Sequence, residues 1–576
     1  MRRRRALSLC GRRLAPAVLL LSLVGSGWSQ GFTVDFGRAG GPPLVKDKFG
    51  VYATPFTPVD ELVRGLPMLR ELNVRDFRYE VAWGKPDAVA FDQIGGTVAS
   101  PTIDFGPLDR LLDGLDAQGV RPLLALSYCP VPLKTRTPWD AWKDVPSDLD
   151  SWRQIHGAYG AHWASRSAPR PFYEVWNEPD MPESGGKMFF NGTADDYLRV
   201  YDSARAGLRA GDAEAEIGGP AAAYDLAYLR PLLTRPIEFA SIHGYANYRD
   251  QLDKMRAALS DHPRVPIFLT EYASFNSFAL DGPSTKSEAA ARFFADVPGL
   301  LSYGDVPKIY WAQWIDDVLG LVGRDGKRRA LFNAFALYGM MPVDRVAVAP
   351  EIDAGVTAFA SAGPEGAAIA LANPGEIART VRLDLRRLPK GLGEIEILRI
   401  DPAHSSVRDD PATELLGVDE RVPLRSSLTV ALPAHGAALL RMRPRRAVVA
   451  PTVPRAMLVR TIYDFPDRAS GAQAHFDPTT MVARLSLEGR GDAVARIGTV
   501  LEGMPRRFRV RTLGSAQTSV RLSLVGTNAS PLILPRNATV DLTRSVPLGW
   551  DGRRIELTFA LEGGGPGARA RVEFLP

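Results

Sequence analysis

The stretch PLDRLLDGLDAQGVRPLLALS, residues 107–127, places a helical repeat directly before a short apolar run. Its leucines recur at the spacing of one helix face: Leu108, Leu111, Leu112 and Leu115. Gly119 is suited to end that helix, and the apolar run after it has the length of a buried strand. The stretch therefore predicts one unit of a helix followed by a strand, the kind that repeats around a parallel sheet.

The same alternation extends in both directions, from about residue 48 to residue 313. We expect strands at FGVYA (49–53), VRDFRY (74–79), RPLLALS (121–127), FYEVW (172–176), AEIGG (215–219), FASIH (239–243), PIFLTE (266–271) and KIYWAQW (308–314). Eight strands in about 270 residues fit a (β/α)8 TIM barrel, for which about 250 residues are typical. The predicted fold class is thus α/β plus all-β, with the barrel domain within residues 30–342.

The helical period disappears beyond Pro342, where short β-rich runs are separated by glycine, proline and asparagine. These runs predict an antiparallel β-sandwich domain over residues 343–445. A linker rich in proline and arginine follows over 446–455, and a further C-terminal β-sandwich over 456–576. The last domain has either a structural or a carbohydrate-binding role.

Residues 1–29 have the layout of an export signal. A basic segment, MRRRRALSLCGRR, precedes the apolar LAPAVLLLSLV and the small residues of GSGWSQ. An apolar run of eleven residues is short of the about 20 that a membrane helix needs, so cleavage after Ser29 is favoured over a retained anchor. We therefore expect an exported protein, periplasmic or extracellular, without a membrane anchor.

Removal of this segment changes the charge of the chain. Six arginines leave with it, so the net charge falls from +5 to about −1, and the basic sequence pI no longer argues for a nucleic-acid partner. Cys129 is then the one cysteine left, which excludes an internal disulfide. The oligomeric state is not predicted.

Two glutamates occupy the positions where a parallel barrel carries its chemistry, the carboxyl ends of strands. Glu178 stands in YEVWNEPD (173–180), after the fourth predicted strand, and Glu271 ends the seventh. Two carboxylates facing each other across a bound sugar are what glycosidic hydrolysis requires. The sequence contains no HExxH motif, cysteine cluster or phosphate-binding loop, so we expect neither a metal nor a cofactor.

Several phrases, in this order, resemble glycoside hydrolase family 39 of clan A: IDFGPLDRLLDGL, FYEVWNEPD, Gly218-Gly219-Pro220, FASIHGY and IFLTEY. The resemblance covers roughly residues 30–443. It implies a retaining double displacement in which Glu178 is the general acid/base and Glu271 the nucleophile, while Asn177 binds the substrate 2-hydroxyl. A sandwich behind the barrel is also implied, to which TVDFGRAGGP (33–42) would add a strand.

Further strand-end residues are expected around the pair. His243 and Tyr245 resemble the family residues that bond near the nucleophile and position the sugar, although a purely structural role in the core is the alternative for both. Arg78 would orient Glu271 or keep it ionised, unless it forms a structural ion pair. Trp311 would offer an apolar platform to a sugar face. Other acids of these strands and loops are interpreted as structural or solvated: Glu80, Glu174, Asp180 and Glu183.

The sugar is less constrained than the reaction. FRYEVAWGK (77–85) departs from the β-xylosidase pattern and is closer to family members that resemble bacterial exopolysaccharide hydrolases. Cleavage of an extracellular polysaccharide or oligosaccharide is therefore favoured, with an exo-acting β-xylosidase on xylo-oligosaccharides as the alternative. A non-catalytic polysaccharide-binding or scaffold protein is the alternative from another class, and the presence of both glutamates argues against it.

Overall fold

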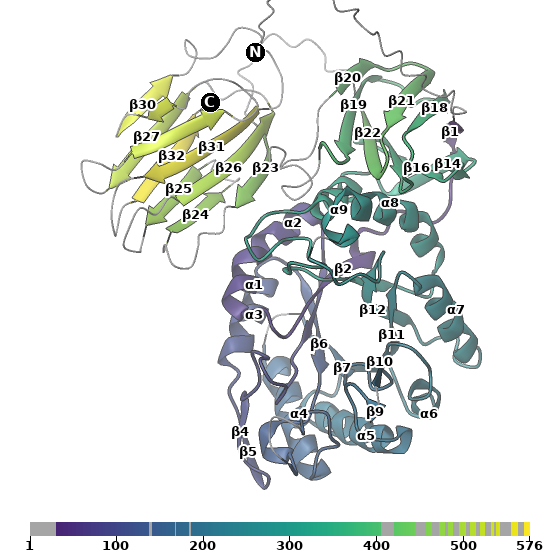
Figure 1. Cartoon of the computed structure of the whole chain (residues 1–576), viewed down its shortest axis with the longest axis vertical. Helices are drawn as coiled ribbons and strands as arrows, with labels where there is room; N and C mark the ends of the chain where they lie inside the picture. The colour runs from purple at the N-terminus through teal and green to yellow at the C-terminus, as the bar shows by residue number, and fades with distance from the viewer. Residues whose placement is uncertain are drawn as a thin grey trace, which may run out of the picture.

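The computed structural model describes residues 30–404 apart from 137–140, 167–168, 184–185 and 281, then residues 420–444, and between 457 and 575 the strands and Asn537. The expected export signal (1–29) and the linker (446–455) lie outside these residues. Within the described part, no helix combines the length and apolar character that a membrane crossing requires. Figure 1 shows a barrel ringed by helices, a β-domain beside it and a separate C-terminal β-domain.

The first domain is a closed barrel of eight parallel strands. In chain order these are β2 (Phe49–Ala53), β3 (Asp76–Glu80), β6 (Arg121–Leu126), β7 (Phe172–Val175), β10 (Glu216–Ala222), β11 (Phe239–Tyr245), β12 (Ile267–Ala273) and β13 (Lys308–Ala312). Each strand pairs with its neighbour in this order, and β13 closes onto β2. The TIM-barrel prediction is confirmed, and all eight expected strands are present.

Helices surround the barrel: α1 (Val59–Gly65), α2 (Leu69–Leu72), α3 (Gly106–Asp116), α4 (Leu149–Ala164), α5 (Ala194–Gly211), α6 (Leu229–Leu232), α7 (Tyr248–Ala258), α8 (Ser287–Ser302) and α9 (Ala330–Gly339). The leucine face that predicted α3 is buried. The start of α5 is a capping box, in which Thr193 and Asp196 bond each other's backbone amides. Two short hairpins lie among the loops, β4 (Ile94–Thr97) with β5 (Ser100–Ile103) and β8 (Pro182–Glu183) with β9 (Gly186–Lys187).

The barrel interior changes from apolar to charged along its axis. An apolar cluster that includes Phe172, Phe239 and Phe268 fills one layer. Strand alternation brings Glu174, two residues beyond Phe172, onto the same inward face, where it pairs with Arg78. The apolar layer supports the charged one, which lies nearer the carboxyl ends of the strands.

The second domain is a ten-stranded sheet around its own core. Its order is β20 (Glu420–Pro423), β19 (Leu392–Ile400), β22 (Gly436–Pro444), β17 (Gly366–Asn373), β16 (Val356–Gly363), β14 (Asp344–Ala349), β1 (Gln30–Ala39), β18 (Arg379–Arg386) and β21 (Ser427–Leu432), with β15 (Ile352–Asp353) beside β16. The expected N-terminal strand is present as β1, so these residues belong to this sheet although we assigned them to the barrel range. The expected antiparallel pairing is confirmed for the described strands of residues 344–444, and β1 adds one antiparallel pairing, with β14, and one parallel pairing, with β18.

Described residues beyond 456 form two antiparallel sheets of five strands each. One contains β23 (Met457–Tyr463), β26 (Ala495–Glu502), β31 (Ile555–Glu562), β28 (Ser519–Leu524) and β29 (Leu532–Leu534). The other contains β24 (Ala472–Asp477), β25 (Val482–Leu487), β32 (Arg569–Leu575), β27 (Arg507–Leu513) and β30 (Ala538–Asp541). A carbohydrate-binding role for this domain stays a prediction.

Candidate active site

Glu178 is brought into the barrel mouth by a sharp turn of the backbone after β7. Trp176 and Glu178 have φ angles of 73° and 47°, in the left-handed region that few residues other than glycine adopt. The amide of Glu178 donates to the carbonyl of Ala221 at 3.2 Å, which fastens this turn to the next strand, β10. Left-handed backbone that the surroundings hold in place is frequent at functional sites.

Glu271 reaches the same place through an irregularity in β12. The strand pairing places Leu269 opposite Ile242 and Glu271 opposite His243, so Thr270 is an extra residue on the β12 side. A bulge of this kind reverses the alternation of the side chains that follow it. Phe268 lies in the barrel interior, so regular alternation from it would direct Thr270 inward and Glu271 outward. The bulge directs Glu271 inward instead.

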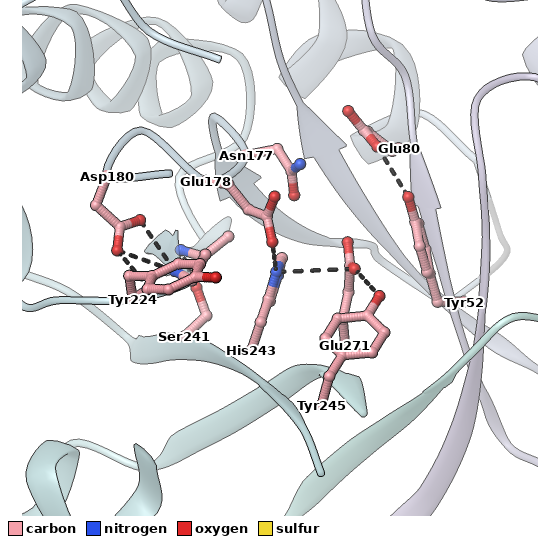
Figure 2. A network of polar contacts seen from close by, with 12 residues as sticks. Tyr52, Glu80, Asn177, Glu178, Asp180, Tyr224, Ser241, His243, Tyr245 and Glu271 are labelled. Atoms are coloured by element: carbon pink, nitrogen blue, oxygen red, sulfur yellow. Dashed lines mark hydrogen bonds and ion pairs between the residues drawn. The ribbon is translucent and has the colours of Figure 1, made fainter. Parts of the chain in front are cut away.

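His243, from β11, stands between the two carboxylates (Figure 2). Its Nδ1 lies 2.7 Å from Oε1 of Glu178 and 3.8 Å from Oε2 of Glu271. One side-chain ligand atom from each of the three residues can be chosen so that all lie within 4.8 Å of one another. The two carboxylates are thus close neighbours, and all three residues are buried.

Glu271 is held as an anion by the groups around it. Nη1 of Arg78 donates to its Oε1 at 2.8 Å, and the Tyr245 hydroxyl donates to its Oε2 at 2.5 Å. Burial by itself would raise the pKa of Glu271, but the charges of His243 and Arg78 and the hydrogen bonds from Tyr245 and Arg78 outweigh it and lower the pKa. The carboxylate is therefore suited to act as a nucleophile.

Glu178 is shifted in the opposite direction. Burial raises its pKa, and the negative charges of Glu271 and Asp180 add to the rise, whereas the hydrogen bond and charge of His243 oppose it. The pKa of His243 is itself raised: burial would lower it, but the two carboxylates outweigh this effect. Two adjacent carboxyl groups whose pKa values are displaced in opposite directions are suited to acid and base roles.

Arg78 lies at the centre of the charged layer. It is fully buried, and its remaining nitrogens donate to Glu174 (Nε, 2.8 Å) and to Oδ1 of Asn177 (Nη2, 2.7 Å). A buried guanidinium is tolerated when its donors are satisfied in this way. Arg78 therefore connects β3 to the turn after β7 and to β12. Two roles were expected as alternatives, orientation of Glu271 and a structural ion pair, and the same set of contacts serves both.

Asn177 is oriented from both ends of its amide. While Oδ1 accepts from Arg78, Nδ2 donates to the hydroxyl of Tyr128 at 3.2 Å. The second hydrogen on Nδ2 makes no hydrogen bond among the described residues. It could therefore be donated to a hydroxyl oxygen of a bound sugar.

Three further residues near the site were not singled out from the sequence as functional. Tyr52 donates to Oε2 of Glu80 at 2.8 Å, and its ring lies under the Arg78 guanidinium, 4.6 Å from centroid to Cζ. Tyr128 fixes Asn177, as described above. Strand parity places Glu80 inward, two residues beyond Arg78, which is the signal that could have identified it.

Asp180 is buried, not a solvated loop acid as expected. Its carboxylate accepts the backbone amides of Ala223, Tyr224 and Asp225 at 2.7–3.1 Å. It therefore ties the turn that carries Glu178 to the loop after β10. Figure 2 shows it beside Tyr224, on the far side of Glu178 from Glu271.

Trp311 is not at the barrel mouth, and the expectation that it offers a sugar platform is wrong. Its ring is buried against Phe293 of α8 and Phe335 of α9, and its indole donates to the carbonyl of Leu319. Tyr310 and Ala312, on either side of it in β13, face the barrel interior instead. Strand alternation therefore directs Trp311 outward to the helices.

Glu178, His243 and Glu271 also form a set of donor atoms compact enough for a metal ion. The Arg78 guanidinium already supplies positive charge to Glu271, and the hydrogen bond between His243 and Glu178 uses a donor atom of each. Nε2 of His243, however, is buried without a hydrogen-bond partner among the described residues, so these contacts do not satisfy the whole set. That the protein uses no metal stays a prediction.

Comparison with known proteins places this site in a family. Residues 92–343, which include both carboxylates, match the family model of glycosyl hydrolases family 39. The barrel domain belongs to glycoside hydrolase family 39. A β-xylosidase from Caldicellulosiruptor saccharolyticus is 26% identical over 202 residues, covering 30% of this chain and 41% of that protein. The chain therefore spans less than half the length of this curated relative.

Solved structures share the family 39 fold. A monomeric β-xylosidase from Caulobacter crescentus aligns with a TM-score of 0.59 at 16% identity, covering 72% of this chain and 100% of that one. A bacterial orthologue of human α-L-iduronidase aligns with a TM-score of 0.58 at 15% identity, covering 94% of this chain and 96% of its own. At these identities the likeness concerns the fold alone.

Proposed function

We propose that the protein is a retaining glycoside hydrolase in which Glu271 attacks the anomeric carbon and Glu178 protonates the leaving oxygen. The observation that carries this proposal is the pair of buried carboxylates on either side of His243, with Arg78 bonded to Glu271, an arrangement that lowers the pKa of Glu271 while the pKa of Glu178 is raised. Carboxylates about 5–5.5 Å apart are typical of retaining enzymes, and the closest carboxylate oxygens here lie within 4.8 Å.

The contacts of Glu178 support an order for the proposed proton transfers. Oε1 of Glu178 faces His243, so Oε2 is the oxygen left to carry the transferred proton. Attack by Glu271 breaks the bond to the leaving oxygen, which takes that proton, and a covalent glycosyl intermediate results. Glu178, now ionised, removes a proton from water as the water attacks the same carbon and releases Glu271.

β-Xylosides are the first substrates that we propose, because the matched relative from Caldicellulosiruptor saccharolyticus is a β-xylosidase. A second candidate is an extracellular polysaccharide cut within the chain, which the departure of residues 77–85 from the xylosidase pattern favours. Export of the protein, expected from residues 1–29, is part of this proposal.

The experiment compares wild type, Glu178→Gln and Glu271→Gln on aryl β-xylosides and on extracted polysaccharides. Loss of the nucleophile should reduce kcat at least about 10⁴-fold on every substrate. Glu178→Gln should lose activity mainly where the leaving group is poor, because an activated aryl group needs no proton. NMR of the first-released anomer tests retention, and product length separates terminal from internal cleavage.

Two outcomes would contradict the proposal. Full activity in Glu271→Gln would refute the nucleophile assignment, and an inverted first product would refute the double displacement. A non-catalytic scaffold predicts binding of polysaccharide without any release of reducing ends, in wild type and variants alike.

A further inference from the structure

A lysine beside Tyr128, the hydrogen-bond partner of Asn177, has aromatic rings around its ammonium group. Nζ of Lys85 lies 4.6–5.2 Å from the ring centroids of four residues: Phe56, Tyr128, Trp142 and Phe189. We call these four rings the aromatic cup. They come from the loops after β2, β6 and β7, whereas Lys85 follows β3, so the cup is built at the carboxyl ends of the barrel strands.

The cup holds the charge of Lys85 without neutralising it. Among the described residues, its ammonium has neither a hydrogen bond nor an ion pair. Cation–π contacts stabilise an ammonium but add no negative charge. Lys143, next to Trp142 in sequence, differs in this respect, because its ammonium pairs with Glu183 at 2.9 Å.

The position of Lys85 is fixed by the loop that carries it. Trp83 donates its amide to the carbonyl of Ser127 at 2.7 Å, and the Lys134 ammonium donates to the carbonyl of Gly84 at 2.6 Å. Ala82 and Gly84 have φ angles of 55° and 63°, so the loop turns sharply before Lys85. A side chain on such a fastened loop is positioned before any ligand arrives.

The cup is joined to the catalytic residues through one side chain. The Tyr128 ring contributes a wall of the cup, and its hydroxyl accepts from Nδ2 of Asn177 at 3.2 Å. Lys85 and the edges of the cup are partly exposed, with Phe56 39% exposed. The cup thus places a partly exposed cation, without a hydrogen bond or ion pair among the described residues, one side chain away from Asn177.

We propose that Lys85 binds an anionic substituent, a carboxylate or a sulfate, on the sugar that lies against β3 and β6, so that the enzyme prefers acidic glycans. This inference rests on the proposed function, because it assigns the substrate class of the same site. An anion placed against Lys85 gains charge attraction in a partly desolvated setting, and the aromatic rings beside it exclude water.

Binding to the full-length Glu271→Gln protein, measured by calorimetry, tests the inference without turnover. The probes are oligosaccharides that carry a uronic acid, the same oligosaccharides with the carboxyl group reduced to the alcohol, and sulfated counterparts. The parent should bind a carboxylate or sulfate probe about tenfold more tightly than the neutral one, and added salt should reduce that preference.

Substitution of Lys85 should remove the preference. Lys85→Met keeps the aliphatic stem in the cup and should bring the acidic-to-neutral affinity ratio close to one, while Lys85→Arg should restore most of it. Lys143→Met, the matched control at the same rim, should keep the ratio. Thermal unfolding of each variant separates loss of the charge from loss of the fold.

Three results would overturn the role of Lys85. The first is equal affinity of the Glu271→Gln protein for acidic and reduced probes. The second is an acidic-to-neutral affinity ratio that Lys85→Met leaves unchanged, and the third is a ratio that Lys143→Met lowers as much as Lys85→Met does. If wild type nonetheless cleaves neutral aryl glycosides, the proposed function stands and the inference alone fails. If no probe binds and no glycoside is cleaved, both are refuted.

Discussion

The division of labour between two chemically identical side chains is set by their neighbours. Glu271 accepts hydrogen bonds from a guanidinium and a phenol, whereas Glu178 shares one hydrogen bond with a histidine that also lies near Glu271. Burial raises the pKa of both carboxyl groups, so the charges of His243 and Arg78 and the hydrogen bonds from Tyr245 and Arg78 account for the lowered pKa of Glu271. The pH dependence of catalysis should therefore report on these donors.

Tyr245→Phe should shift the acidic limb of kcat/KM to higher pH. The proposed mechanism requires an ionised Glu271, and Tyr245 lowers the pKa of Glu271 by donating to it, so loss of the Tyr245 hydroxyl raises that pKa. A hydrogen bond to a charged group is worth about 1.5–3 kcal/mol, which corresponds to a displacement of about one pH unit or more. The alkaline limb, where Glu178 loses its proton, should move less.

Tyr248→Phe is the matched control for this measurement. Its hydroxyl also donates to a carboxylate, that of Asp296 at 3.2 Å, but it lies on α7 outside the site. It should leave both limbs in place. An acidic limb that does not move in Tyr245→Phe would show that this limb does not report the ionisation of Glu271.

The two glutamates could be singled out from the sequence because each lies at the carboxyl end of a recognisable apolar strand. The orientation of Glu271 could not, since it depends on the bulge at Thr270, which exists only in the pairing of β12 with β11. Arg78 contacts residues far from it in the chain, Glu174 at a separation of 96 positions and Glu271 at a separation of 193. No local sequence pattern indicates these contacts.

At the level of secondary structure, strand periodicity predicts that a residue lies in a strand but not which face it occupies. Trp311 illustrates this limit: Tyr310 and Ala312 take the inward positions, so the large apolar ring beside them packs against the helices. The parallel pairing of β1 with β18 was missed for a related reason, because the two strands are separated by the whole barrel.

Asp180 should control the geometry of the turn between β7 and the loop after β10. Asp180→Ala removes the acceptor of three backbone amides, at a cost of about 2 kcal/mol in the free energy of unfolding. Because the turn also carries Glu178, we expect kcat to fall about tenfold or more while Glu271 stays in place. Thermal unfolding and hydrogen exchange at residues 223–225 measure the two effects.

Asp225→Ala provides the comparison for that variant. Asp225 lies in the same loop, and its carboxylate accepts one backbone amide, from Ala227 at 2.8 Å; its own backbone amide donates to Asp180, a hydrogen bond that the substitution keeps. Its loss should change kcat little. If the two variants reduced kcat equally, the loop as a whole, and not its bond to Asp180, would position Glu178.

The molecule as a whole joins the barrel to the second domain through a shared apolar layer. One face of the ten-stranded sheet forms its own core, and residues of the other face, including Phe359 and Leu439, belong to the barrel's apolar cluster. Phe359 lies 6.0 Å from Phe294 of α8, ring centroid to ring centroid, and Figure 1 shows α8 and α9 beside β16 and β22. The barrel and this sheet should therefore unfold as one cooperative unit.

Phe32→Ala tests that coupling at a distance from the interface. Phe32 lies on β1 and is buried in the sheet's own core, so its truncation should cost about 3–5 kcal/mol. Residues 344–444 contain no tryptophan, so in a background with Trp28→Phe and Trp550→Phe the fluorescence reports the barrel domain alone. A cooperative unit requires the fluorescence transition to fall to a lower temperature in Phe32→Ala.

Thr33→Ala, the control, removes a side chain on the opposite face of β1 and should shift the fluorescence transition little. A barrel transition that stays unchanged while the sheet melts earlier by circular dichroism would show that the two domains unfold independently.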